Sequence, residues 1–195
     1  MDLKRLFLVG ALTLATVAAS VDVAEARMRR IKLDENANVS ASQYEVTKLW
    51  VLVPETLEVS EANNYLPLAD IVWRGDPPGN RYEQVDTLVT ESMERGVAGL
   101  SGPTKVEVVV QISRFHCLTE KARAEVGGYY GIQFYLSVRD PVTKQPIRPD
   151  VWIDATKIAL GGQAAIVAEL AGSTQKAVVS EHLERTIRAA LVASE

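Results

Sequence analysis

Residues 106–113 read VEVVVQIS, and residues 132–139 read IQFYLSVR. In both stretches every second residue is apolar, and most of the residues between them are polar. Successive side chains of a strand point to opposite faces, so this spacing predicts two strands with one apolar and one polar face. Strands of this kind are typical of an antiparallel sheet that buries one face and leaves the other to solvent.

The alternation is disturbed at the end of the first strand. Arg114 and His116 occupy positions that should be apolar, whereas Phe115 and Cys117 occupy positions that should be polar. One extra residue in a strand shifts the phase in this way, so we expect a β-bulge after Ile112.

Further strands are predicted on both sides of this pair. Residues 49–53 are apolar without interruption and end at Pro54, which indicates a strand over 46–53 that is buried on both faces or central in the sheet. A turn at 140–144 leads to a third strand of the meander, over roughly 151–160. Shorter elements are expected at 56–59 (edge strand), 60–64 (a helical turn capped by Ser60) and 70–74 (strand).

Two main helices complete the pattern. Asn80 and Glu83 resemble a capping box after the loop 75–80, and a helix should run from there to 96–99. The last helix carries an apolar residue at every fourth position from Val179 to Leu191, and a short helix is predicted over 163–171. The fold class is therefore α+β: an antiparallel sheet with the two main helices packed on one face, a two-layer sandwich.

The N-terminal 26 residues have the order of a signal peptide. A positive start (Lys4, Arg5) precedes the mostly apolar run 6–21 and the small-residue exit Ala24-Glu25-Ala26. The alternative is a retained membrane anchor, although the run is short for a bilayer span. Cys117 is the single cysteine, so no lipid-attachment cysteine follows the exit. We expect a periplasmic or secreted protein that is not a lipoprotein.

Residues 27–43 are expected to form a flexible basic and polar arm before a single domain over 44–195. Weak contact with an anionic membrane surface is possible through four basic residues of the arm: Arg27, Arg29, Arg30 and Lys32. The net charge of the whole chain is −4, which argues against a nucleic-acid partner.

Two sequence patterns suggest nucleophilic catalysis, and each has a simpler interpretation. Ser173 and Lys176 have the S-x-x-K spacing of penicillin-binding proteins, but the K-[TS]-G element of those enzymes is missing, and Ser173 or Thr174 suits a helix N-cap. Cys117 adjoins His116, yet neighbours on a strand point apart, which favours a buried structural cysteine. No spacing typical of a metal or cofactor site is present. We therefore predict no catalytic residue, no metal and no cofactor.

One group of charged and aromatic residues is the candidate binding surface for a ligand or partner. It combines the end of the 106–116 strand and the loop after it with the segment that precedes the first helix. Its alternative is a solvated loop. Trp73 would supply the aromatic anchor typical of a binding hot spot. The members are Trp73, Arg74, Asp76, Arg114, His116, Glu120, Lys121 and Arg123.

Three longer strings resemble a known family. They are YLPLADIVWRGDPPG at 65–79, RFHCLTEKARAEVGG at 114–128 and GGQAAIVAELAGSTQK at 161–176. Together they resemble an uncharacterised family of alphaproteobacterial secreted proteins and lipoproteins, a domain of unknown function, over most of the chain after Tyr44. The resemblance implies no activity and no catalytic residue. The order of elements is also similar to that of small envelope lipoproteins that assist transport complexes, an analogy of fold alone.

The sequence thus predicts an exported, periplasmic, non-enzymatic binding or accessory protein of the bacterial cell envelope, with an envelope protein or a lipid-linked molecule as its partner. A periplasmic carrier of small molecules or lipids is the alternative. A hydrolase that uses Ser173 or Cys117 is the third.

Overall fold

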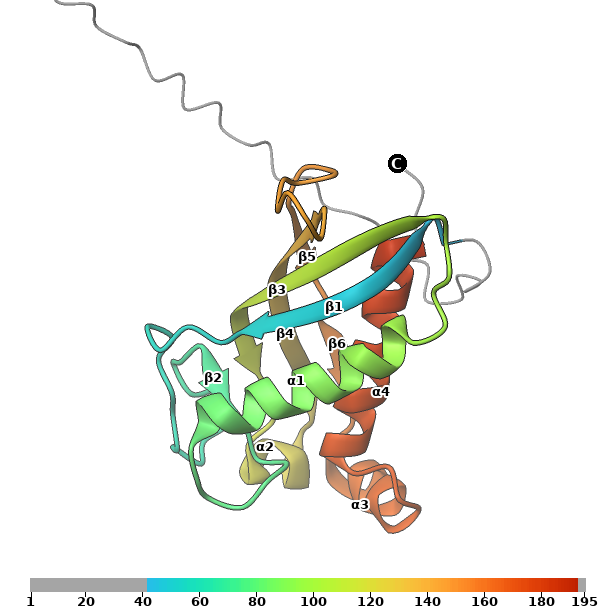
Figure 1. The fold of residues 1–195 in the computed structure, drawn as a ribbon. Helices are drawn as coiled ribbons and strands as arrows, with labels where there is room; N and C mark the ends of the chain where they lie inside the picture. The colour runs from blue at the N-terminus through green and yellow to red at the C-terminus, as the bar shows by residue number, and fades with distance from the viewer. Residues whose placement is uncertain (1–41, 193–195) are drawn as a thin grey trace, which may run out of the picture.

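The computed structural model describes residues 42–192 (Figure 1). The predicted signal peptide and nearly all of the predicted arm, including its four basic residues, lie outside the described residues. Six strands and four helices occur in the described part. They are β1 (Tyr44–Leu52), β2 (Ile71–Val72), α1 (Arg81–Val97), β3 (Thr104–His116), α2 (Glu120–Glu125), β4 (Gly128–Arg139), β5 (Val151–Asp154), β6 (Lys157–Ala159), α3 (Gly162–Leu170) and α4 (Gln175–Val192).

The six strands form one mixed sheet around β3 and β4. These two strands are antiparallel, and β5 and β6 both pair antiparallel with β4. β1 and β2, by contrast, run parallel to β3, so the predicted antiparallel sheet is mostly, but not entirely, antiparallel. The reason is the connection between β1 and β3: it contains α1, and a crossover through a helix returns the chain in the direction in which it left.

The apolar face of the sheet and the two long helices share one core. Val106, Val108, Val110 and Ile112 of β3 are fully buried, as the alternation predicted. Figure 1 shows α1 and α4 crossing beside the sheet. Eight buried apolar residues of these helices belong to the same cluster as those of β3 and β4: Val85, Leu88, Val89, Met93, Val179, Leu183, Ile187 and Leu191. The α+β character of the chain is confirmed.

The predicted bulge is present. The register between β3 and β4 shifts between Ile112 and Arg114, where Ser113 is the extra residue. Beyond it the buried phase changes, so that Phe115 enters the core. His116 and Cys117 are buried as well, because β2 pairs with this end of β3.

Side-chain caps begin the two long helices. The Asn80 Oδ1 atom accepts hydrogen bonds from the N–H groups of Tyr82 and Glu83, which confirms the N-terminal cap of α1. The Thr174 Oγ1 atom accepts from the N–H of Ala177 at 3.2 Å, which makes Thr174 the cap of α4.

Several local predictions need correction. β1 lies at an edge of the sheet, and its Trp50 and Leu52 are 45% and 49% exposed, so the strand is not buried on both faces. Residues 56–59 contribute only an isolated bridge from Val59 to Ile71, and the segment after Ser60 contains no helical turn. The third strand of the meander is interrupted at Ala155–Thr156 and becomes β5 and β6, whereas α2 replaces a predicted loop.

None of the helices described is long and apolar enough to cross a membrane.

Candidate functional site

Trp73, the expected aromatic anchor, lies in the core. The side chain is fully buried, and its ring meets the ring of Phe115 edge-on at a centroid distance of 5.6 Å. The indole N–H donates a 2.7 Å hydrogen bond to Asp76 Oδ2, which satisfies its one polar group. Trp73 follows β2, whose pairing with β3 brings it against Phe115. It is therefore not an exposed anchor.

Arg74 and Glu120 do come together. The Arg74 guanidinium lies between two carboxylates, 3.0 Å from Glu61 and 3.3 Å from Glu120, and it also donates to the carbonyl oxygens of Ser60 and Trp73. Its side chain is largely buried by these contacts. The arrangement connects three segments of the chain and engages all three nitrogens of the Arg74 guanidinium, so it acts as an internal clamp.

Arg81, which the sequence analysis overlooked, extends the same clamp. This buried side chain binds Glu61 through two contacts of 2.7 and 3.1 Å, and it donates to the carbonyl oxygens of Asp76 and Pro77. The hydrogen bond from Arg81 is the main reason why the pKa of Glu61 lies below its usual value. In the sequence Arg81 is simply the first residue of a helix, where an exposed arginine is the ordinary expectation.

Asp76 joins the loop before α1 to the start of α4. Its Oδ1 atom is 2.5 Å from Nζ of Lys176, a residue 100 positions away in the sequence. Burial opposes ionisation of Asp76, but the hydrogen bonds from Lys176 and Trp73 outweigh it, and the pKa is lowered. Lys176 is thus engaged by a carboxylate, and Thr174 caps the helix, which favours the N-cap interpretation of the S-x-x-K pattern.

Replacing Asp76 with asparagine should make the free energy of unfolding decrease less as the pH is lowered. A carboxyl group with a lowered folded-state pKa stabilises the fold above its unfolded pKa, and this contribution disappears as the pH falls through the folded value. The loss for Asp76 therefore lies below its ordinary pKa of 3.8. Urea titrations from pH 7 to pH 2 should give a smaller decrease for Asp76→Asn than for the parent chain. The exposed Asp150, replaced with asparagine, is the control; equal curves for all three proteins would contradict the prediction.

The remaining predicted site residues, His116, Lys121, Arg114 and Arg123, lie in different places. His116 and Lys121 lie under the segment 63–67: His116 Nε2 is 2.9 Å from the Pro67 carbonyl oxygen, and Lys121 Nζ lies 4.5 Å from the centre of the Tyr65 ring. Arg114 is half-buried opposite Gln133 and has no ion-pair partner within residues 42–192. Arg123 lies toward α3, where it forms a 2.6 Å ion pair with Glu169. The predicted surface is thus mostly a set of internal contacts.

Cys117 is buried at the end of β3. Burial raises the pKa of its thiol, which keeps the sulfur protonated. The neighbouring His116 is engaged with Pro67, and His182 has its Nε2 atom 2.8 Å from the Ala155 carbonyl oxygen. These contacts favour the structural interpretation of Cys117. No group of three or more metal-ligating side chains occurs within the part of the chain that the structure describes.

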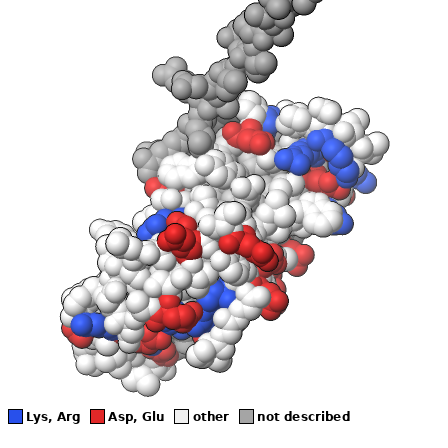
Figure 2. All heavy atoms as spheres, turned by 90° about the vertical axis from the view of Figure 1, so that its left-hand side faces the viewer, with Lys and Arg blue, Asp and Glu red and all other residues white. Residues whose placement is uncertain are grey.

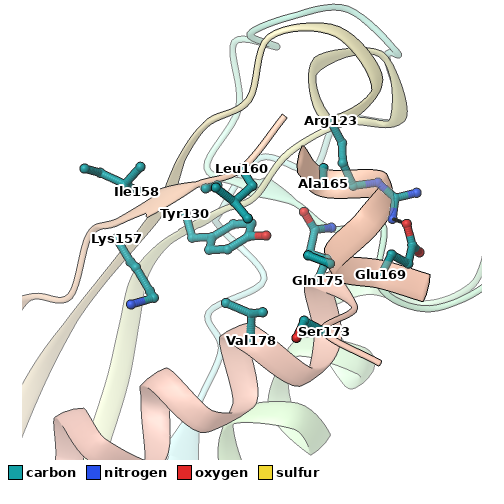
Figure 3. A pocket seen from close by; sticks show the side chains of 12 residues that line it. Arg123, Tyr130, Lys157, Ile158, Leu160, Ala165, Glu169, Ser173, Gln175 and Val178 are labelled. Carbon is teal, nitrogen blue, oxygen red and sulfur yellow. Dashed lines mark hydrogen bonds and ion pairs between the residues drawn. The ribbon is translucent and has the colours of Figure 1, made fainter. Parts of the chain in front are cut away.

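A cavity of about 260 Å³ lies between β6, α3 and α4 (Figure 3). Tyr130 of β4 stands in its middle, with its hydroxyl directed toward Gln175 of α4. This cavity was not predicted from the sequence, because its walls come from five elements: α2, β4, β6, α3 and α4. The lining residues are Arg123, Tyr130, Lys157, Ile158, Ala159, Leu160, Ala165, Ala168, Glu169, Ser173, Gln175 and Val178.

The exterior has no field of one sign on the face drawn in Figure 2, where acidic and basic side chains alternate with uncharged areas. Exposed apolar side chains also occur on the elements that surround the cavity. We call Val126, Ile158, Leu160, Ile166, Val167 and Leu170 the α3 patch. Val126 is included because a Cβ atom added at Gly161, the residue before α3, would lie 2.4 Å from the Val126 carbonyl carbon.

Comparison with known proteins shows the family to which the chain belongs. The model of a family of unknown function, DUF6778, matches residues 44–195, that is, the described domain from the first residue of β1 onward. No curated protein and no solved structure matches the chain. The three strings that suggested a domain of unknown function all lie within the matched range. The chain belongs to the family of unknown function DUF6778.

Proposed function

We propose that this chain is an exported, non-enzymatic binding or accessory protein of the bacterial cell envelope, from an alphaproteobacterial family, and that it holds an envelope protein through the α3 patch. Export is inferred from the order of charged, apolar and small residues in 1–26. The observation that carries the binding role is the exposure of α3, an apolar helix at the surface.

Helix α3 has the composition of a buried helix. Its sequence GQAAIVAEL contains one charged residue, and a helix that is apolar all round normally lies inside a protein. Here only Ala165 is buried, whereas Val167 and Leu170 are 57% and 85% exposed. β6 adds Ile158 at 74%. Contiguous apolar surface marks interaction sites in soluble proteins, and we propose that these side chains form such a surface.

The absence of an enzymatic role is part of the proposal. It is supported by the capping role of Thr174, by the ion pair of Lys176 with Asp76 and by the protonated state of the Cys117 thiol.

We also propose that the sheet and the α1–α4 pair form the two layers of a sandwich. In that arrangement the outer face of the sheet, with Trp50 and Tyr135, stays open to solvent. Weak contact of Arg27, Arg29, Arg30 and Lys32 with anionic lipid completes the proposal.

Site-specific photo-crosslinking in cells that produce the protein tests the role of the patch. A photoreactive amino acid at Val167 should give one discrete adduct with an envelope protein, whereas the same group at the exposed Thr87 of α1 should not. Leu170→Glu, in the chain labelled at Val167, should reduce the adduct at least fivefold. Because Leu170 is exposed, this change should alter the free energy of unfolding by only about 0.5 kcal/mol. Equal labelling from Val167 and Thr87, or no adduct, would refute the docking role.

A second candidate function, a small-molecule or lipid carrier of the periplasm, is favoured by the cavity beside the patch. Native mass spectrometry of the purified protein separates the two candidates. A bound small molecule that survives purification supports the carrier, whereas the mass of the bare chain supports the interaction module.

A further inference from the structure

We infer that the cavity between β6, α3 and α4 binds a small, singly charged anion with a short apolar body, of which a medium-chain carboxylate is the simplest example, and that Lys157 holds the negative group. The inference rests on the carrier function proposed above and adds to it the chemical class of the ligand. It is argued from the charges, the hydrogen-bond donors and the size of the cavity.

The cavity lining contains two positive side chains and one negative side chain, so one positive charge is not balanced within the lining. Arg123 and Glu169 neutralise each other across 2.6 Å. Lys157 lines the cavity, is half-buried, and has no ion-pair partner among the residues that the structure describes. Figure 3 shows Lys157 and the Arg123–Glu169 pair on opposite sides of Tyr130. An anion beside Lys157 would complement this charge, and a cation would be repelled.

The Tyr130 hydroxyl provides a second donor, on the side of the cavity that faces Gln175 rather than Lys157. Burial is the main cause that raises the pKa of Tyr130 to about 12, so the group stays protonated at neutral pH. It forms no hydrogen bond with another described residue, and it faces the cavity. The carboxamide of Gln175, by contrast, is occupied by the backbone N–H and carbonyl of Leu118, at 3.1 and 3.4 Å. Lys157 is therefore the charged group of the lining left to hold a negative head, and the hydroxyls of Tyr130 and Ser173 are uncharged donors of the same lining.

The rest of the wall is apolar and narrow. Ile158, Leu160, Ala165, Ala168 and Val178 offer only hydrocarbon to a ligand. The volume of about 260 Å³ lies just below the roughly 300–1,000 Å³ typical of pockets for drug-sized ligands. A single short chain fits such a space, whereas a lipid with two long chains does not.

Three probes with the same tail test the inference: octanoate, octanol and octylamine. Titration of the isotope-labelled protein, followed by NMR, should shift the signals of Ala159 and Val178, which line the cavity. We expect octanoate to bind at least tenfold more tightly than octylamine, with octanol between them. Lys157→Met should weaken octanoate about fivefold and leave octanol unchanged. Lys105→Met, at an exposed lysine at the start of β3, is the matched control and should change neither.

The possible outcomes separate the two levels of the proposal. Equal affinity for all three probes would overturn the anion recognition and leave the carrier function standing. No binding of any probe would overturn both. Ala168→Phe should fill the cavity and abolish the octanoate shifts while thermal unfolding confirms a folded protein; unchanged octanoate binding in that variant would place the ligand elsewhere and overturn the inference.

Discussion

Replacing Trp73 with alanine is expected to lower the free energy of unfolding by about 3–5 kcal/mol, the usual range for a large buried aromatic residue. The ring is fully buried against Phe115, and its N–H is bonded to Asp76. Alanine would leave a cavity beneath the loop and remove the donor that helps to hold the Asp76 carboxylate. Part of the loop before α1 should loosen as a consequence.

Urea denaturation followed by circular dichroism measures this effect, and Trp50→Ala is its matched control. Trp50 is the same residue type at 45% exposure, with the Lys48 ammonium 3.7 Å from its ring centre, so its loss should cost only about 1 kcal/mol. Trp73→Phe, which keeps most of the ring volume, should fall between the two. Losses of equal size for Trp73→Ala and Trp50→Ala would show that Trp73 is an accessible side chain after all.

Local patterns were enough to predict the central strands and the long helices. The alternation of 106–112 depends only on neighbours in the chain, and so does the phase change that revealed the bulge after Ile112. The same holds for Asn80, whose cap involves the residues that directly follow it. Such features are encoded within a few residues, which is why the sequence predicts them well.

The direction of β1 relative to β3 could not be predicted from local sequence patterns. An uninterrupted apolar run such as 49–53 is compatible with a central strand or with an edge strand, and it does not specify its partner. The parallel pairing with β3 follows from the path of the chain through α1. The break between β5 and β6 is similar: the side chain of Asp154 accepts hydrogen bonds from Thr156 and turns the chain there.

The candidate site was the hardest part to predict, since its contacts join distant segments. Trp73 stands among Arg74, Gly75 and Asp76, a composition typical of an exposed loop, and only its contact with Phe115 reveals its burial. The pairing of Lys176 with Asp76 spans 100 positions. The one signal that pointed to the cavity region was the apolar composition of residues 163–171, which is unusual for a surface helix.

Gly161→Ala should be the most damaging small substitution in this region, with an expected loss of about 3 kcal/mol, the upper end of what overpacking usually costs. Gly161 ends the segment after β6 and caps α3, and its backbone touches the turn that follows α2. A Cβ atom there would lie 1.8 Å from the backbone nitrogen of Gly127 and 2.4 Å from its Cα atom. Backbone atoms cannot rotate away, so β6 and α3 would have to move apart from α2.

Gly172→Ala is the control that separates this contact from backbone conformation. Gly172 has a φ of 90° and nothing within 4 Å of an added Cβ, so its cost of about 1–2 kcal/mol is conformational. Gly161 has a φ of −137°, which any residue adopts, so its cost comes from the contact alone. Urea denaturation of both variants should rank Gly161→Ala as clearly the less stable. If the order were reversed, the close approach of Gly161 to Gly127 would not exist in solution, and the walls of the cavity formed by β6 and α3 would have to be placed differently.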